Sequence, residues 1–224
     1  MKILIINPNS DPEMTAAIER TALDFAAGDF EVDCRLTPGA PRFIETFEDE
    51  LKAAPGMIRL LRDHHDHCDA FVIACHCDPN LDVLKEISRK PVVGIGEASM
   101  KIASMLGHRF SILSATRHSI PHKEDLVRKY HLEGMLASIR TAGEGVGALV
   151  DQDGYIRAAR RAAEEDGAEV IVLGCAGMTR LDRVIQERLG VPVLDGVVCA
   201  LIIAGGLAKY GLSTSRAGKY DPGD

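Results

Sequence analysis

The sequence predicts an α/β protein with two pseudo-symmetric lobes, each a parallel sheet flanked by helices, and an active site in the cleft between them. Short apolar runs alternate with longer amphipathic stretches along the chain, which is typical of parallel sheets with right-handed crossovers. Several of these runs are continuously apolar, as expected for strands that are buried on both faces. The second half of the chain also repeats the pattern of the first half.

The predicted elements follow one another in order from the amino terminus. Short apolar runs rich in β-branched residues favour strands, and apolar residues at helical spacing favour helices. Strands are expected at Ile3–Ile6, Phe30–Leu36, Ala70–Ala74, Val92–Ile95, Phe110–Leu113, Ala137–Arg140, Glu169–Leu173 and Val193–Leu194. Helices are expected at Pro12–Ala27, Glu45–His67, Leu81–Arg89, Glu97–Leu106, His118–Tyr130, Gln152–Asp166, Thr179–Leu189 and Val197–Tyr210. The first helix follows a Ser10-Asp11 capping signal and has Pro12 in its first turn.

Composition excludes several classes of protein. The 224 residues include 26 Lys+Arg and 33 Asp+Glu, giving a net charge of −7, so a non-specific nucleic-acid binder is not expected. The longest strongly apolar stretch, Val197–Ala208, has 12 residues, whereas a spanning helix needs about 20. The amino terminus lacks the features of a signal peptide. We therefore expect a cytoplasmic protein whose six cysteines are free thiols.

An internal repeat divides the chain into two similar halves. The run from Ala70 to Cys75 matches the run from Glu169 to Cys175, and a proline follows each cysteine, 16 residues later at Pro91 and 17 residues later at Pro192. The repeat predicts a first lobe at residues 1–96 and a second lobe at residues 97–205. The C-terminal segment, residues 206–224, is expected to pack back on the first lobe.

The repeat places Cys75 and Cys175 at the carboxyl ends of equivalent strands, where active groups of α/β sheets gather. If the halves face each other, the two thiols approach one ligand from opposite sides. A carbon acid held there can lose a proton to one thiol and regain it from the other, which inverts the stereocentre without a cofactor. Thiols suit this step because their pKa of about 8.5 is close to neutrality. Cys75 and Cys175 are therefore the predicted catalytic residues.

Polar residues in the turns after the first strand of each half are candidates for substrate binding. Asn9 and Ser10 follow the first strand, and Thr116 occupies the equivalent turn. Their side chains are able to bind carbonyl oxygens and to stabilise a developing enolate. Ser10 has an alternative role as a helix cap. Backbone N–H groups after each cysteine offer similar hydrogen bonds.

Four motifs in order resemble the aspartate/glutamate/hydantoin racemase superfamily, most closely its hydantoin and allantoin racemase branch. They are Ile6-Asn-Pro-Asn-Ser10, Ala74-Cys75-x-x-Asp78-Pro79-x-Leu81, Gly94-Ile95-x-Glu97-Ala98 and Leu173-Gly174-Cys175-Ala176-Gly177-Met178. The resemblance implies that Cys75 and Cys175 are catalytic. It also implies that the substrate is bound by a loop with Pro41 and Ile44 and by the residues around the second cysteine, namely Gly174, Ala176, Gly177 and Met178. The chain departs from the family pattern at His76, Cys77 and Asn80.

Two of these departures lie beside the first cysteine. His76 is expected to contact the substrate or, as a cation, to favour a thiolate at Cys75. Cys77 is expected next to Cys75 but without a direct part in proton transfer. A metal site is an alternative interpretation, since residues 63–69 are rich in His and Asp. A solvated helix end is expected there instead, because the spacing lacks a CxxC pair.

The sequence leads us to expect a cofactor-independent racemase acting on a 5-substituted hydantoin or allantoin. Two alternatives stay open. One is a dicarboxylic amino-acid racemase, maleate isomerase or decarboxylase on the same fold, and the other is a metal or redox sensor. No GxGxxG follows a strand and no Walker A motif is present, so no nucleotide cofactor is expected. We expect a small-molecule substrate, no nucleic-acid or membrane partner, no bound metal, and assembly as a homo-oligomer.

Overall fold

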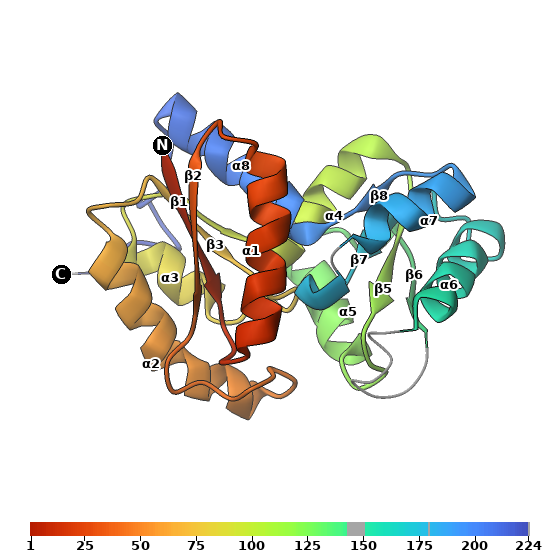
Figure 1. The fold of residues 1–224 in the computed structure, drawn as a ribbon, viewed down its shortest axis with the longest axis horizontal. Coiled ribbons are helices and arrows are strands. Elements are labelled where there is room, and N and C mark those ends of the chain that lie inside the picture. Colours follow the sequence, from red (N-terminus) through yellow and green to blue (C-terminus); the bar gives the residue numbers. More distant parts are fainter. Residues whose placement is uncertain (143–150, 179, 224) are drawn as a thin grey trace.

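Two four-stranded parallel sheets form the framework of the protein. The computed structural model describes residues 1–142, 151–178 and 180–223. The strands are β1 (Lys2–Asn7), β2 (Glu31–Leu36), β3 (Ala70–Ile73), β4 (Val92–Gly94), β5 (Phe110–Ser114), β6 (Leu136–Thr141), β7 (Val170–Leu173) and β8 (Val193–Leu194). Their orders are β2-β1-β3-β4 and β6-β5-β7-β8, and the sheets lie in separate halves of the molecule (Figure 1). The predicted fold class is confirmed.

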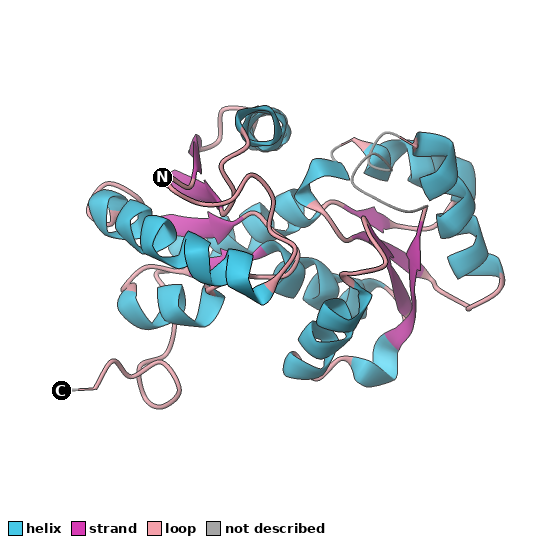
Figure 2. Ribbon diagram, turned by 90° about the horizontal axis from the view of Figure 1, so that it is seen from below, coloured by secondary structure: helices cyan, strands magenta, loops and turns pink. Residues whose placement is uncertain are grey.

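Helices cover both faces of each sheet (Figure 2). They are α1 (Pro12–Ala26), α2 (Phe47–His64), α3 (Leu81–Ile87), α4 (Ile95–Leu106), α5 (Ile120–Lys129), α6 (Gln152–Glu164), α7 (Leu181–Leu189) and α8 (Gly196–Tyr210), with short 3-10 turns η1 (Glu133–Met135) and η3 (Ala176–Met178). In the first half, α1 and α8 pack on one face of the sheet, and α2 and α3 on the other. In the second half, α6 and α7 face α4 and α5 across the sheet.

The repeat seen in the sequence is visible in the backbone hydrogen bonds. Phe71 N–H donates to Pro91 O at 2.9 Å, and in the second half Ile171 N–H donates to Pro192 O at 2.9 Å. The residue before the first cysteine, Ala74, bonds to the end of β1, and Gly174 bonds in the same way to β5. The two halves therefore present their cysteines from equivalent positions.

Several helix boundaries differ from the prediction by one to three residues, and the starts of α4 and α2 differ for identifiable reasons. α4 begins at Ile95, two residues earlier than expected, because the distant Asp78 carboxylate accepts from the N–H groups of Gly96 at 2.9 Å and Glu97 at 2.6 Å. α2 begins only at Phe47 because Thr46, just before the helix, and Asp49, in its first turn, form a reciprocal capping box. The predicted start of the seventh helix, position 179, lies outside the described residues.

α8 returns the chain from the second sheet to the first. Val197 and Leu201 pack in one cluster with Ile3 and Val72 of the first sheet. α8 also contacts α4, so these two helices lie where the halves meet (Figure 1). Part of the segment 97–205 therefore covers the first sheet. Among the described helices, none combines the length and the apolar character needed to cross a membrane.

The tail beyond α8 is held by hydrogen bonds to the first half. The Arg216 guanidinium donates to the carbonyl oxygens of Glu86 and Ser88, at 3.0 and 2.8 Å. Tyr220 OH donates to the Asp82 carboxylate at 2.9 Å. These contacts fix the tail beside α3.

Candidate functional site

A cavity lies where the carboxyl ends of the central strands of both sheets meet. Its walls are formed by the segments that follow β1, β2, β3, β5 and β7, together with residues of α1, α2 and α5. The lining residues are Asn9, Met14, Phe43, Ile44, Glu45, Glu50, Ala74, Cys75, His76, Cys77, Ala115, Thr116, Ser119, His122, Lys123, Gly174, Cys175 and Ala176. Both halves of the repeat thus contribute to one site.

Cys75 and Cys175 occupy matching places on opposite halves of this wall. Each follows its strand after one small residue and enters a tight turn. Asp78 N–H donates to Cys75 O at 2.9 Å, and Met178 N–H donates to Cys175 O at 3.1 Å. Both cysteines are partly buried free thiols that line the cavity. The structure therefore brings the two predicted catalytic residues to the same cavity.

The environments of the two thiols differ. Burial raises the pKa of Cys175, while a hydrogen bond from Gly177 N–H at 3.4 Å and the charge of Lys123 oppose that rise. The pKa of Cys75 lies well above its ordinary value, first because its thiol donates a hydrogen bond to Cys77 and second because it is buried. Burial therefore favours the protonated thiol at both positions.

A buried lysine lies beside the second cysteine. Lys123 is 2% exposed, and its Nζ donates to Gly174 O at 2.9 Å. Its positive charge lowers the pKa of both Cys77 and Cys175. Sequence reasoning missed this residue, because α5 contains so many charged residues that it resembles an exposed helix. Only the packing of α5 over the cavity reveals Lys123.

A third thiol, an imidazole and a carboxylate form a connected set on the same wall. The pKa of Cys77 lies well below its ordinary value, because it accepts hydrogen bonds from Cys75 and His122 and lies near Lys123. His122 Nε2 is 3.4 Å from Glu50 Oε1. The hydrogen bond to Cys77 raises the pKa of His122, whereas burial raises that of Glu50 to about 7. None of these three residues was selected from the sequence as a site residue.

The two polar turns contribute Asn9 and Thr116 to the lining, as expected. Asn9 Oδ1 accepts from Asn7 Nδ2 at 2.7 Å and from Asp11 N–H at 3.0 Å, so its orientation is fixed. Thr116 Oγ1 accepts from Ser119 N–H at 3.3 Å. Ser119 itself also lines the cavity, and it was not predicted.

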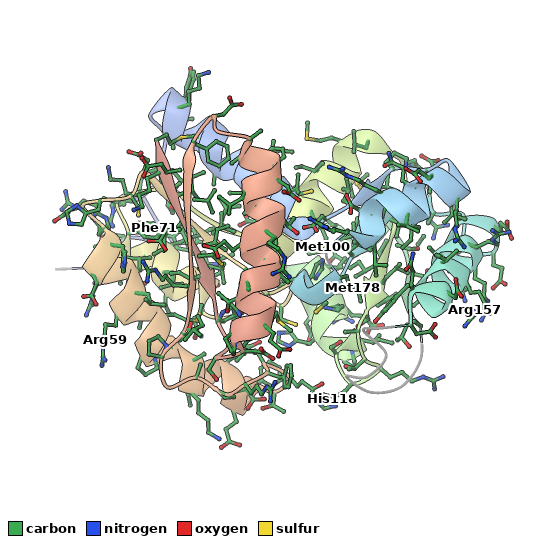
Figure 3. All side chains as sticks on the ribbon, in the orientation of Figure 1. Arg59, Phe71, Met100, His118, Arg157 and Met178 are labelled. Carbon is green, nitrogen blue, oxygen red and sulfur yellow. The ribbon has the colours of Figure 1, made fainter. Side chains whose placement is uncertain are left out.

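Four predicted binding residues are not among those that line the cavity. Ser10 N–H donates to Pro41 O at 3.0 Å, which ties two loops together. Asp11, rather than Ser10, caps α1. Gly177 donates to the Cys175 sulfur, and Met178 (labelled in Figure 3) is buried in the core of the second sheet. Of the other predicted residues, Ile44, Gly174 and Ala176 do line the cavity.

His76 lines the cavity in surroundings that disfavour the expected positive charge. Burial lowers its pKa well below the ordinary value, and Lys123 lowers it further. Its Nε2 is 3.4 Å from Ser99 Oγ on α4. These surroundings favour the neutral ring over the cationic His76 that was expected to assist a thiolate at Cys75.

The loop after Cys75 is held in a fixed shape by Asp78 and Asn80. Asp78 also accepts from Tyr130 OH at 2.7 Å; burial raises its pKa to about 7 in spite of its hydrogen bonds. Asn80 has a φ of 57°, a left-handed conformation that Asn tolerates better than most residues. Its side chain donates to Glu50 O at 2.8 Å, which connects α2 to the segment between β3 and α3, residues 74–80, called the cysteine loop below.

The histidine-rich segment lies before β3, at the opposite end of that strand from Cys75. His64 Nδ1 is 3.0 Å from Leu60 O, and His65 Nε2 accepts from Arg89 N–H at 3.1 Å. Within residues 1–142, 151–178 and 180–223, no group of three or more His, Cys, Asp or Glu side chains is arranged to hold a metal ion.

Comparisons with known proteins agree with this architecture. The family model for Asp/Glu/Hydantoin racemase matches residues 3–204. A hydantoin racemase of Pseudomonas sp. (strain NS671) is 39% identical over 226 residues, covering 98% of this chain and 91% of that protein. The structure of allantoin racemase from Klebsiella pneumoniae has a TM-score of 0.95 at 33% identity and covers 100% of this chain and 94% of its own. Allantoin racemase from Pseudomonas fluorescens gives a TM-score of 0.93 at 33% identity, with 98% and 96% covered.

The similarity extends over almost the whole chain and includes both halves of the cavity. It confirms the expectation that the protein is an isomerase of the racemase type. With the two repeated sheets and the paired strand-end cysteines, these matches show that the chain belongs to the Asp/Glu/hydantoin racemase family.

Proposed function

We propose that the protein racemises a 5-substituted hydantoin or allantoin by two-base proton transfer between Cys75 and Cys175, without a cofactor. One observation carries this proposal. Two thiols at equivalent positions of the repeated halves line the same cavity. A planar intermediate bound between them has one face toward each half of the site.

In the proposed reaction, the thiolate of one cysteine removes the proton from the stereocentre. The electron pair moves into the adjacent carbonyl and forms an enolate, and the thiol of the other cysteine delivers its proton to the opposite face. Asn9, Thr116 and Ser119 offer hydrogen bonds to the ring oxygens, and the Lys123 ammonium lies close enough to reduce the cost of the negative charge. The opposite enantiomer uses the same thiols in exchanged roles.

The lining favours an uncharged ring over a free dicarboxylic amino acid. Met14, Phe43 and Ile44 supply apolar surface, and none of the described lining residues is an arginine. Glu45 and Glu50 add acidic side chains to the lining, which suits an uncharged ring better than a dicarboxylate substrate. The relatives named as hydantoin and allantoin racemases agree with this choice.

We also propose that the protein works in the cytoplasm. All six cysteines are free, and a reducing compartment keeps closely spaced thiols from forming disulfides. Such a compartment preserves the thiol and thiolate forms that the proposed reaction requires.

A circular-dichroism assay of the purified protein tests the proposal. Single enantiomers of allantoin, a panel of 5-substituted hydantoins, aspartate and glutamate are incubated with the enzyme. We expect loss of optical activity with at least one ring compound and none with the free amino acids. Activity confined to aspartate or glutamate would show that the substrate class is wrong.

A further inference from the structure

The two-thiol reaction leaves the third thiol of the cavity unexplained. Cys77 lies on the cavity wall with Cys75 and Cys175. It also borders a second depression, which is formed by residues of α2, α3 and α5 and which shares Glu50 and His122 with the cavity. Cys77 is thus the point where the cysteine loop meets α2 and α5.

The groups beside Cys77 favour an anion. Cys77 lines the cavity together with Cys75, His122 and Lys123, and its interactions with the Cys75 thiol, the Lys123 charge and the His122 ring lower its pKa. His122 is held in turn by Glu50 at 3.4 Å, and its ring packs on Phe47 with 5.0 Å between centroids. Glu50 is fixed through its backbone by Asn80. The arrangement resembles a nucleophile, a base and an orienting carboxylate.

We propose that Cys77 is the resident thiolate of the site and that it accepts the proton of Cys75, so that Cys75 becomes the base of the reaction. This inference rests on the proposed function for the identity of the reaction. His122 and Glu50 are positioning residues in this scheme, because they act through Cys77 and not on the substrate.

The proton count balances without another reactant. The S–H bond of Cys75 breaks and an S–H bond forms at Cys77, which leaves the negative charge on Cys75. Cys75 then takes the substrate proton, and Cys175 gives its own proton to the other face. The site ends with thiols at Cys75 and Cys77 and a thiolate at Cys175, ready for the opposite enantiomer.

Charged and titratable groups from each surrounding element favour or disfavour a thiolate at Cys77. α5 contributes His122 and the buried Lys123, both of which favour the thiolate. α2 contributes Glu50, which lies near Cys77 and disfavours a second negative charge. The segment after β7 contributes Cys175, whose thiolate would repel that of Cys77. His122 and Lys123 therefore oppose one carboxylate, Glu50, whose own pKa is raised to about 7.

The other five cysteines make this assignment measurable. Burial raises the pKa of Cys34 and of Cys199 to about 12, and the pKa values of Cys68, Cys75 and Cys175 are raised as well. Cys77 is the cysteine whose pKa is lowered. At neutral pH, the ultraviolet absorbance of thiolate in the wild-type protein therefore reports the ionisation of Cys77.

The first test compares three serine variants by this absorbance as a function of pH. Cys77→Ser should lose the neutral-pH thiolate signal, and Cys75→Ser should keep it. Cys68 is buried just before β3, at the end of that strand away from the cavity. Cys68→Ser is therefore the matched control and should resemble the wild type. Loss of the signal in Cys75→Ser with retention in Cys77→Ser would overturn the proposal, because the resident charge would then belong to Cys75.

The second test measures the pH dependence of kcat/KM. Cys77→Ser and His122→Gln should each move the acid limb of the profile to higher pH by about one unit or more. On the acid side of the profile, this shift lowers kcat/KM by about tenfold. Raising the pH should restore most of the rate. The double variant should shift no further than Cys77→Ser alone, since His122 acts through Cys77. Unchanged profiles, or additive shifts, would contradict the scheme.

His122→Gln leaves the cysteine loop intact, so it keeps the test decisive if Cys77→Ser fails to fold. The absorbance measurement needs no substrate, and it therefore separates this inference from the proposed function. If Cys75→Ser and Cys175→Ser are inactive while the absorbance assigns the thiolate elsewhere, the proposed function stands and the role of Cys77 does not.

Discussion

Lys123 shows how one buried charge determines the chemistry of the site. Lys123 is 2% exposed, and its ammonium donates to Gly174 O, directly before Cys175. A cation in this low-dielectric position favours the thiolate form of its neighbours. Lys123 thus links the fold of α5 to the acidity of thiols that belong to both halves of the repeat.

We predict that Lys123→Met lowers kcat/KM at neutral pH by about tenfold or more, a barrier increase of about 1.4 kcal/mol. Loss of the positive charge raises the pKa of Cys77 and Cys175, so less thiolate is present at a given pH. The acid limb of the pH–rate profile should therefore move to higher pH. Lys52→Met, an exposed change on α2, is the control, and equal behaviour of the two variants would refute this role of the charge.

At the scale of the elements, close packing around Asp78 fixes the loop that carries Cys75. This carboxylate reaches from the end of the first sheet to the first turn of α4. Gly94 leaves the space it needs, since a Cβ there would lie 2.2 Å from Asp78 Oδ1. The position of the cysteine loop and the start of α4 therefore depend on the same contact.

We expect Gly94→Ala to lower the free energy of unfolding by about 1–3 kcal/mol, because the added methyl group must displace Asp78. Gly206→Ala is the matched control in α8, where a Cβ meets nothing within 4 Å. That change should instead stabilise the protein by about 0.5–1 kcal/mol, because alanine favours a helix over glycine. Denaturant unfolding measures both values, and a destabilisation of the same size in both variants would contradict the explanation.

Most of the helices and strands could be predicted from the sequence. Apolar runs and capping signals predicted the eight strands and the helices between them, because these patterns depend on local burial and turn chemistry. The start of α4 was missed because its cap, Asp78, lies 18 residues from Gly96 in the sequence. Lys123 and His122 were missed for a similar reason: only tertiary packing turns one face of the charged helix α5 toward the cavity.

At the scale of the whole molecule, the cavity couples two sheets that have separate cores. The lining includes segments that follow β1 and β3 on one side and segments that follow β5 and β7 on the other. Helices α4 and α8 contact each other where the halves meet. On the proposed function, a ligand that contacts both sides should stabilise the relative position of the halves as well as each binding loop.

We predict that a ring substrate at about 100 times its Kd raises the free energy of unfolding by about 2.7 kcal/mol. Hydrogen exchange should slow in both β3 and β7, because each strand ends at the cavity. Thermal unfolding with and without the ligand provides the first measurement, and exchange of individual amides provides the second. Protection limited to one half would show that the ligand does not bridge the two sheets.

The central claim is that the two cysteines serve opposite faces of one bound substrate. Stereospecific hydrogen exchange in deuterated solvent tests it most directly. Cys75→Ser and Cys175→Ser should each lose racemisation, since a serine hydroxyl is far less acidic than a thiol. Each variant should still exchange the α-proton of one enantiomer faster than the other, with opposite preferences, because the remaining thiol reaches only one face. Normal racemisation by both variants, or the same preference in both, would contradict the two-thiol account.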